Sequence, residues 1–165
     1  MPIIQNFLSE LDAEAKTTAR VLERVPAEHL SWTPHPKSSS LGRLAWHIAS
    51  IPATAQRLLR AGTFDLSAAR PAQELPTDTA AIVAEFHRNF ADTRAYLETL
   101  TDDFLRESFN IVRDGQTRMT IPRIGVVRTI LMNHTYHHRG QLSVYLRLLD
   151  VPLPTIYGST ADEAM

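Results

Sequence analysis

Two histidines stand one helical turn apart near the C-terminal end of the sequence. His134 and His138 fall in a segment whose apolar residues recur every three or four positions, a spacing that predicts an α-helix. Side chains four residues apart lie one above the other on a helix face, so both imidazoles can reach a single point. This is the arrangement by which a helix presents two nitrogen ligands to a metal ion.

The same spacing predicts that both histidines lie on the inward face of that helix. A buried imidazole nitrogen without a hydrogen-bond partner costs about 1–3 kcal/mol, so two imidazoles in a core require a shared partner. A bound metal is one such partner, and hydroxyl groups or water molecules are the alternative that the residue pattern leaves open. The predicted inward face comprises Ile124, Val127, Leu131, His134, His138, Leu142, Tyr145 and Leu149.

The other five histidines differ in how well they could supply a third ligand. His47 flanks the apolar stripe of an earlier predicted helix and is the best candidate. We expect His87 at the boundary between core and surface, and His137 at the edge of a neighbouring helix. His29 and His35 lie in a proline-bounded segment that cannot be helical, where we expect both to be solvated.

Two more residues near these histidines have more than one interpretation. Gln141 lies on the same helix face as His138 and could orient a ligand or a bound water, or make a polar contact between helices. Pro52 lies inside the predicted helix of His47, where a proline frees the carbonyl four residues earlier. It predicts either a kink that opens space beside His47 or a bend that follows the curvature of the packed helices.

The elements that must position these residues are long helices. Apolar periodicity, prolines and capping residues predict helices over about residues 3–24, 40–61, 78–100 and 120–149. These predict an all-α four-helix bundle, in which a long crossover over residues 62–77 makes the second and third helices parallel. Within residues 101–119 we predict an extended loop, with a hairpin around Asp114-Gly115 as the less favoured alternative.

Composition narrows the class of protein. The 165 residues are typical of one domain, and we predict a single domain over residues 1–165. Lys and Arg total 17 against 18 Asp and Glu, so no basic excess indicates a nucleic-acid partner. No apolar run approaches the roughly 18 residues of a membrane span, and acidic residues stand where a signal peptide would be basic. Cysteine is absent, which excludes disulfides and thiolate ligands, and these features together predict a cytoplasmic protein without a membrane partner.

The C-terminal part of the sequence resembles the closing signature of a known family. Residues 133–158, N-H-T-Y-H-H-R-G-Q-L-S-V-Y-L-R-L-L-D-V-P-L-P-T-I-Y-G, are similar to the end of DinB family sequences, and Leu44-Ala45-Trp46-His47-Ile48 is similar to the family's second helix. The most specific part is the His-x-x-x-His-Arg-Gly-Gln stretch, and the resemblance extends in order and length over nearly the whole chain. It implies an up-down-down-up four-helix bundle, a homodimer, and a divalent metal on His47, His134 and His138.

The resemblance also implies a class of function. DinB-like proteins are regarded as metalloenzymes, and some relatives are transferases or isomerases that use a low-molecular-weight thiol such as bacillithiol, mycothiol or glutathione. Three imidazoles with an open coordination position are typical of catalytic metal sites. The leading hypothesis is therefore a metal-dependent S-transferase that activates a thiol for attack on a small-molecule substrate.

Two other functions fit the same residues. One is hydrolysis of a small molecule by a metal-activated water, and the other is a non-catalytic, metal-stabilised binding protein related to stress. The sequence does not determine which metal is bound. We expect zinc or nickel first and iron next, and imidazole ligands also suit copper.

Overall fold

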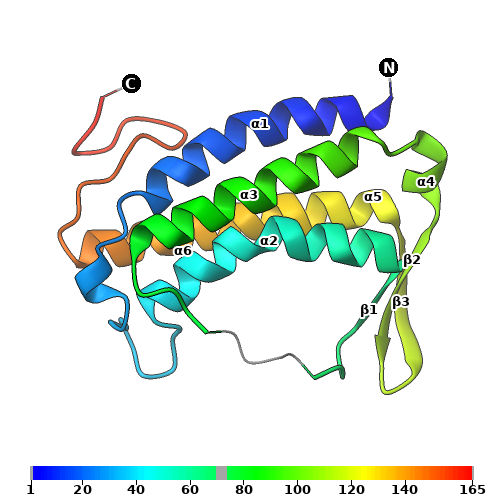
Figure 1. The fold of residues 1–165 in the computed structure, drawn as a ribbon, viewed down its shortest axis with the longest axis horizontal. Helices are drawn as coiled ribbons and strands as arrows, with labels where there is room; N and C mark the ends of the chain where they lie inside the picture. The colour runs from blue at the N-terminus through cyan, green and yellow to red at the C-terminus, as the bar shows by residue number, and fades with distance from the viewer. Residues whose placement is uncertain (1, 70–73, 165) are drawn as a thin grey trace.

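Four long helical segments lie side by side in the computed structural model, which describes residues 2–69 and 74–164 (Figure 1). The first three are α1 (Ile3–Leu22), α2 (Leu41–Ala61) and α3 (Thr79–Glu98). The last is a composite of α5 (Arg123–Val126), the π-helical segment η2 (Val127–Asn133) and α6 (His134–Leu148). Helices α2 and α3 run in the same direction, and α1 and the composite helix run opposite to them (Figure 1).

Local capping explains where two of these helices begin and where one of them ends. The Ser40 side chain accepts a hydrogen bond from the Arg43 amide at the start of α2, and Asp78 accepts one from the Ala81 amide at the start of α3. Helix α2 ends at Ala61 and is capped by Gly62, which adopts the left-handed conformation (φ 68°) that closes a helix at little steric cost.

The prediction of an all-α four-helix bundle is wrong, because the described residues also form a three-stranded sheet. Its strands are β1 (Thr63–Asp65), β2 (Ser108–Arg113) and β3 (Gln116–Pro122), in the order β1-β2-β3. Strand β1 pairs parallel with β2, and β2 pairs antiparallel with β3. The sheet lies at the end of the molecule where α2 ends and α5 begins (Figure 1).

The hairpin of β2 and β3 is the alternative that the sequence analysis ranked second, and the predicted loop is wrong. Asp114 and Gly115 both have positive φ (52° and 72°) at the tip of the hairpin. Positive φ at both central residues defines a two-residue turn whose twist matches that of paired strands, and Asp-Gly is among its preferred sequences. Phe109 is fully buried and joins the hairpin to the helical core.

The connections also differ from the predicted ones. The segment from residue 62 to residue 77 starts with β1 rather than as an irregular crossover, and the Leu66 amide donates to the Val112 carbonyl at 2.8 Å. Residues 70–73 of that predicted crossover lie outside the described residues. The short helix α4 (Asp102–Arg106) was not predicted. The exclusion of helix from the proline-bounded segment is wrong for η1 (Ala27–His29), a 3₁₀ turn, because a proline restricts only the residue before it.

The buried apolar residues form two clusters. One includes Leu58, Phe109 and Leu131 and lies toward the sheet, and the other includes Ile48 and Leu146. In the composite helix, the first cluster ends at Met132 and the second begins at Leu142. The turn that contains the two helical histidines therefore lies where the clusters meet. Within the described part of the chain, no helix is both long and apolar enough to cross a membrane.

Candidate metal centre

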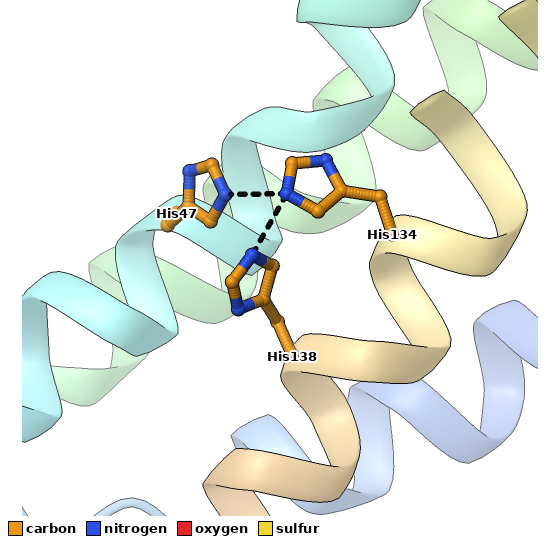
Figure 2. Close-up of side chains that lie close together, drawn as sticks. All are labelled: His47, His134 and His138. Carbon is orange, nitrogen blue, oxygen red and sulfur yellow. Dashed lines mark hydrogen bonds between the residues drawn. The ribbon is translucent and has the colours of Figure 1, made fainter. Parts of the chain in front are cut away.

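Helix α6 is rotated relative to the inward face that the sequence predicts. Thr135 and Arg139 are the deeply buried positions of this turn, with 9% and 1% of their surface exposed. His134 and His138 each precede one of these residues and are half-buried. The two histidines therefore lie on the flank of the helix, beside α2 and accessible from solvent, rather than in the core (Figure 2).

The π-helical segment immediately before His134 accounts for the rotation. A π-helix makes i→i+5 hydrogen bonds, and such segments occur mostly as local insertions in α-helices, frequently at functional sites. A π-helical turn contains more residues than an α-helical turn, so it shifts the positions that follow around the helix axis, and Thr135 and Arg139 are buried where the α-helical period predicts His134 and His138. The main chain of Ile130, inside this segment, is also a hydrogen-bond partner of the His134 ring. The segment thus affects both the direction and the orientation of the first histidine.

Three histidines from two helices converge on one point (Figure 2). The Nε2 atom of His134 lies 2.7 Å from Nε2 of His138, and 3.2 Å from Nε2 of His47 on α2. One ring nitrogen from each of the three residues lies within 4.8 Å of the other two. Among the described residues, this is the group of three or more histidine, cysteine or acidic side chains whose geometry suits a metal ion.

Hydrogen bonds between the three rings cannot satisfy all three Nε2 atoms. Nε2 of His134 contacts two other Nε2 atoms, but in a neutral imidazole it has either one hydrogen or one lone pair. A single hydrogen can be directed at only one of the two neighbours. A cation accepts all three lone pairs, and nitrogens bound at 2.0–2.1 Å to a tetrahedral ion lie about 3.3 Å apart. The donor set therefore fits a divalent metal.

Gln141 determines which nitrogen of His138 has the proton. Its Oε1 atom lies 2.7 Å from Nδ1 of His138, one turn along α6. Because an amide oxygen only accepts hydrogen bonds, Nδ1 is the protonated nitrogen and Nε2 keeps its lone pair. Metal-ligating histidines are commonly oriented in this way by a partner on the other ring nitrogen.

The surroundings keep the two imidazoles of α6 uncharged. Burial lowers the pKa of His134, and the neighbouring His138 and His137 lower it further. Burial also lowers the pKa of His138, against the opposing effect of the Gln141 hydrogen bond. Neutral imidazoles are the form that binds metals.

The other four histidines do not join this group. His137 packs edge-on against His138, with 4.8 Å between ring centroids, and His87 lies beside Phe86 on α3. His29 belongs to η1, and His35 accepts a hydrogen bond from the Lys37 amide. His87, the weaker candidate for a third ligand, is therefore not part of the group that His47 completes.

Pro52 lies beside a small cavity that is separate from the three histidines. It is buried within α2 and lines a cavity of about 20 Å³, whose other walls include Phe86, Thr135 and Tyr136. None of the three clustered histidines lines this cavity. Both interpretations of Pro52, a kink that opens space beside His47 and a bend that follows the helix packing, stay predictions.

A helical protein with a small mixed sheet and a three-histidine candidate metal site is the class that this fold and site define. A family model for the DinB family matches residues 1–164. An uncharacterized protein of Bacillus subtilis (strain 168), YrdA, is 31% identical over 164 residues, which cover 97% of this chain and 91% of that relative. The chain belongs to the DinB family, as the resemblance of residues 133–158 predicts.

Solved structures share the fold. A DinB-like protein from Bacillus cereus ATCC 10987 matches with a TM-score of 0.70 and 25% identity, over 93% of this chain and 97% of that one. YfiT from Bacillus subtilis matches with a TM-score of 0.65 and 16% identity, over 90% of this chain and 88% of that one. YfiT is described as a probable metal-dependent hydrolase with an unusual four-helix bundle topology.

Proposed function

We propose that His47, His134 and His138 together bind one divalent metal ion per chain, with Gln141 orienting His138. The observation that supports this most directly is the convergence of the three Nε2 atoms, two of which lie 2.7 and 3.2 Å from the third. Zinc and nickel are the metals we expect first and iron next, because all three accept imidazole ligands.

We further propose that the protein is a metal-dependent enzyme that acts on a small molecule. Three protein ligands leave a coordination position for water or substrate, which is typical of catalytic rather than structural sites. The bound ion would supply Lewis acidity, which lowers the pKa of a coordinated water or thiol. The three imidazoles contribute no negative charge, so the site favours an anionic ligand in that position.

Two reactions fit this site, and each has its own support. Hydrolysis is supported by the structural similarity to YfiT, which is described as a probable metal-dependent hydrolase. Transfer of a low-molecular-weight thiol is supported by the neutral ligand set, which leaves the ion its full charge to stabilise a thiolate. Turnover of an electrophile that requires added thiol would select the transferase, and turnover without thiol would select the hydrolase. Metal-dependent stability without turnover of either kind would favour a non-catalytic, stress-related binding protein.

Elemental analysis of protein purified without a histidine tag tests the metal site itself. The wild-type protein is expected to contain about one metal ion per chain, and His134→Ala and His138→Ala are each expected to lose most of it. His35→Ala is the matched control, because its ring lies in an exposed loop, where it accepts a hydrogen bond from the Lys37 amide. Full metal retention in both helix variants would contradict the proposed metal site.

The remaining features of the proposal concern the whole chain. We propose a single domain over residues 1–165, supported by two core clusters that both draw on α1, α2 and the composite helix. We also propose a homodimer that works in the cytoplasm. The family resemblance supports the first, and the absence of cysteine is compatible with the second.

A further inference from the structure

Arg139 is the largest fully buried side chain among the described residues, with 1% of its surface exposed. Arginine is almost never fully buried unless its charge is paired. The residue directly follows His138, within the motif that the DinB resemblance singles out, yet neither the metal site nor the proposed reaction uses it. Its burial therefore requires an explanation of its own.

The guanidinium of Arg139 is held from several directions. It forms an ion pair of 2.7 Å with Glu14 on α1, and it donates to the Thr18 hydroxyl at 3.1 Å and to the Tyr157 hydroxyl at 2.5 Å. It also donates to the Glu14 carbonyl at 3.3 Å, and it lies 5.4 and 5.1 Å from the ring centroids of Tyr136 and Tyr157. The partners belong to α1, to α6 itself and to the C-terminal segment, residues 151–164. Arg139 therefore fastens α6 to two other parts of the molecule.

The side chain of Arg139 points to a different neighbouring helix from the side chains of the histidines. Successive residues of an α-helix lie about 100° apart around its axis, so Arg139 is directed at α1 while His138 is directed at α2. A buried ion pair adds little net stability compared with apolar residues of similar size, and its best-attested role is to specify one arrangement of the elements. The contacts of Arg139 fix how far α6 is rotated.

We infer that Arg139 is a positioning residue of the metal centre: by fixing the rotation of α6, it keeps His134 and His138 directed at His47. This inference rests on the proposed metal site. A rotation of α6 by a small angle would separate Nε2 of both helix histidines from Nε2 of His47, because they move together while His47 stays on α2.

The chain contains a matched control for this role. Arg128 binds Glu10 on α1 at 3.0 Å, and Tyr136 donates to the same carboxylate. The composition of this cluster therefore repeats that of Arg139 with Glu14, but its side chains are 42% and 39% exposed, against 2% and 16% in the buried pair. Arg128 also lies in the π-helical segment, more than one turn from His134.

The experiment compares Arg139→Met with Arg128→Met. For each variant, binding of Zn²⁺ and Co²⁺ to metal-free protein is measured at a temperature where circular dichroism shows the apo protein fully folded. The visible absorption of the Co²⁺ form reports coordination geometry, which a change in stability alone would not alter. We expect Arg139→Met to bind at least tenfold more weakly, in the range typical of residues that orient metal ligands, and to change the Co²⁺ spectrum. Arg128→Met is expected to bind within twofold of wild type with an unchanged spectrum.

Two results would overturn the inference. One is Arg139→Met with wild-type affinity and spectrum, and the other is an equal loss of affinity in both variants, which would indicate a general effect of helix packing. If Arg139→Met does not fold, Arg139→Lys decides by the same criteria, since lysine keeps the charge but lacks the planar fork that reaches three partners. Wild-type protein that binds neither ion would contradict the proposed metal site instead, so the two failures are distinguishable.

Discussion

Gln141 has a larger effect on the site than its exposed position suggests. By accepting a hydrogen bond from Nδ1 of His138, it fixes both the ring orientation and the tautomer. The sequence analysis selected His134, His138 and Gln141 because residues three or four positions apart share a helix face, and it selected His47 because that residue flanks the apolar stripe of another helix. It missed Arg139, because hydrophobic patterning assigns an arginine to the surface and the π-helical segment shifts the pattern by one residue.

At this residue, Gln141→Leu is expected to weaken metal binding about 10- to 100-fold. The substitution keeps the size of the side chain but removes the acceptor, so the His138 ring is free to rotate or to place its hydrogen on Nε2. Competition with a chelator of known affinity measures the change. Gln141→Glu retains a carboxyl oxygen that accepts the same bond, and it is expected to bind at least as tightly as the wild type. Equal affinities for Gln141→Leu and the wild type would show that the hydrogen bond is irrelevant to the site.

The lowered pKa values of His134 and His138 set the direction of a second prediction. Protons compete with the metal for Nε2, so affinity is lost as the pH falls through the pKa of each ligand in the folded protein. Because both pKa values lie below the ordinary value of 6.5, affinity is expected to stay constant from about pH 8 to 7 and to fall only below about pH 6.5. Titrations in metal-buffered solution across this range measure it.

His137 provides a check on the cause. The electrostatic interaction with His137 lowers the pKa of both neighbours, so His137→Ala should raise those pKa values and move the loss of affinity to higher pH. His29→Ala, which removes a ring that is not part of the cluster, should leave the curve in place. A loss of affinity that already begins above pH 7 in the wild type would contradict the expected direction.

At the scale of elements, the long helices could be predicted from the sequence and the sheet could not. The helices have apolar residues at every third or fourth position and capping residues such as Ser40 and Asp78 at their starts. Strand β1 has only three residues, and β3 is exposed along almost its whole length, so neither contains enough alternating apolar residues to be recognised. Asp114-Gly115 was the one sequence feature that indicated the hairpin, and the irregular pattern of the flanking residues favoured a loop instead.

The hairpin turn gives a prediction about stability. Gly115 has φ 72°, where an alanine is strained, and among the described residues, apart from its two chain neighbours, no atom lies within 4 Å of where a Cβ would be added. Gly115→Ala is therefore expected to lower the free energy of unfolding by about 1 kcal/mol, through backbone conformation alone. Gly140→Ala is the matched control with the opposite expected sign. Gly140 lies within α6 and has equally open space around an added Cβ, so the substitution should raise the free energy of unfolding by about 0.5–1 kcal/mol. Urea denaturation of both variants measures the pair, and a Gly115→Ala protein as stable as the wild type would argue against the turn.

At the scale of the whole molecule, the candidate site lies between two buried apolar clusters that stabilise the fold. The apolar clusters on either side of the histidine turn bury residues from all the long helices, with Leu58 and Leu131 in one cluster and Ile48 and Leu146 in the other. Each such side chain contributes roughly 1.5–3 kcal/mol before conformational entropy is subtracted. We therefore expect the scaffold to hold the histidines in place without the metal.

Removal of the metal tests this relation between scaffold and site. After chelation, the helical circular dichroism at 25 °C is expected to be nearly unchanged, unlike that of a zinc finger, whose small core does not fold without metal. The metal binds the folded state preferentially, so at a concentration 100 times its dissociation constant it adds about 2.7 kcal/mol of stability. For a chain of this length, that corresponds to a rise of roughly 5–10 °C in the thermal midpoint, which should disappear on chelation and return when metal is restored. His134→Ala should abolish the metal-dependent part of the midpoint and keep the helical signal. Loss of most of that signal on chelation would mean that the metal holds the fold together, and it would count against an open catalytic site.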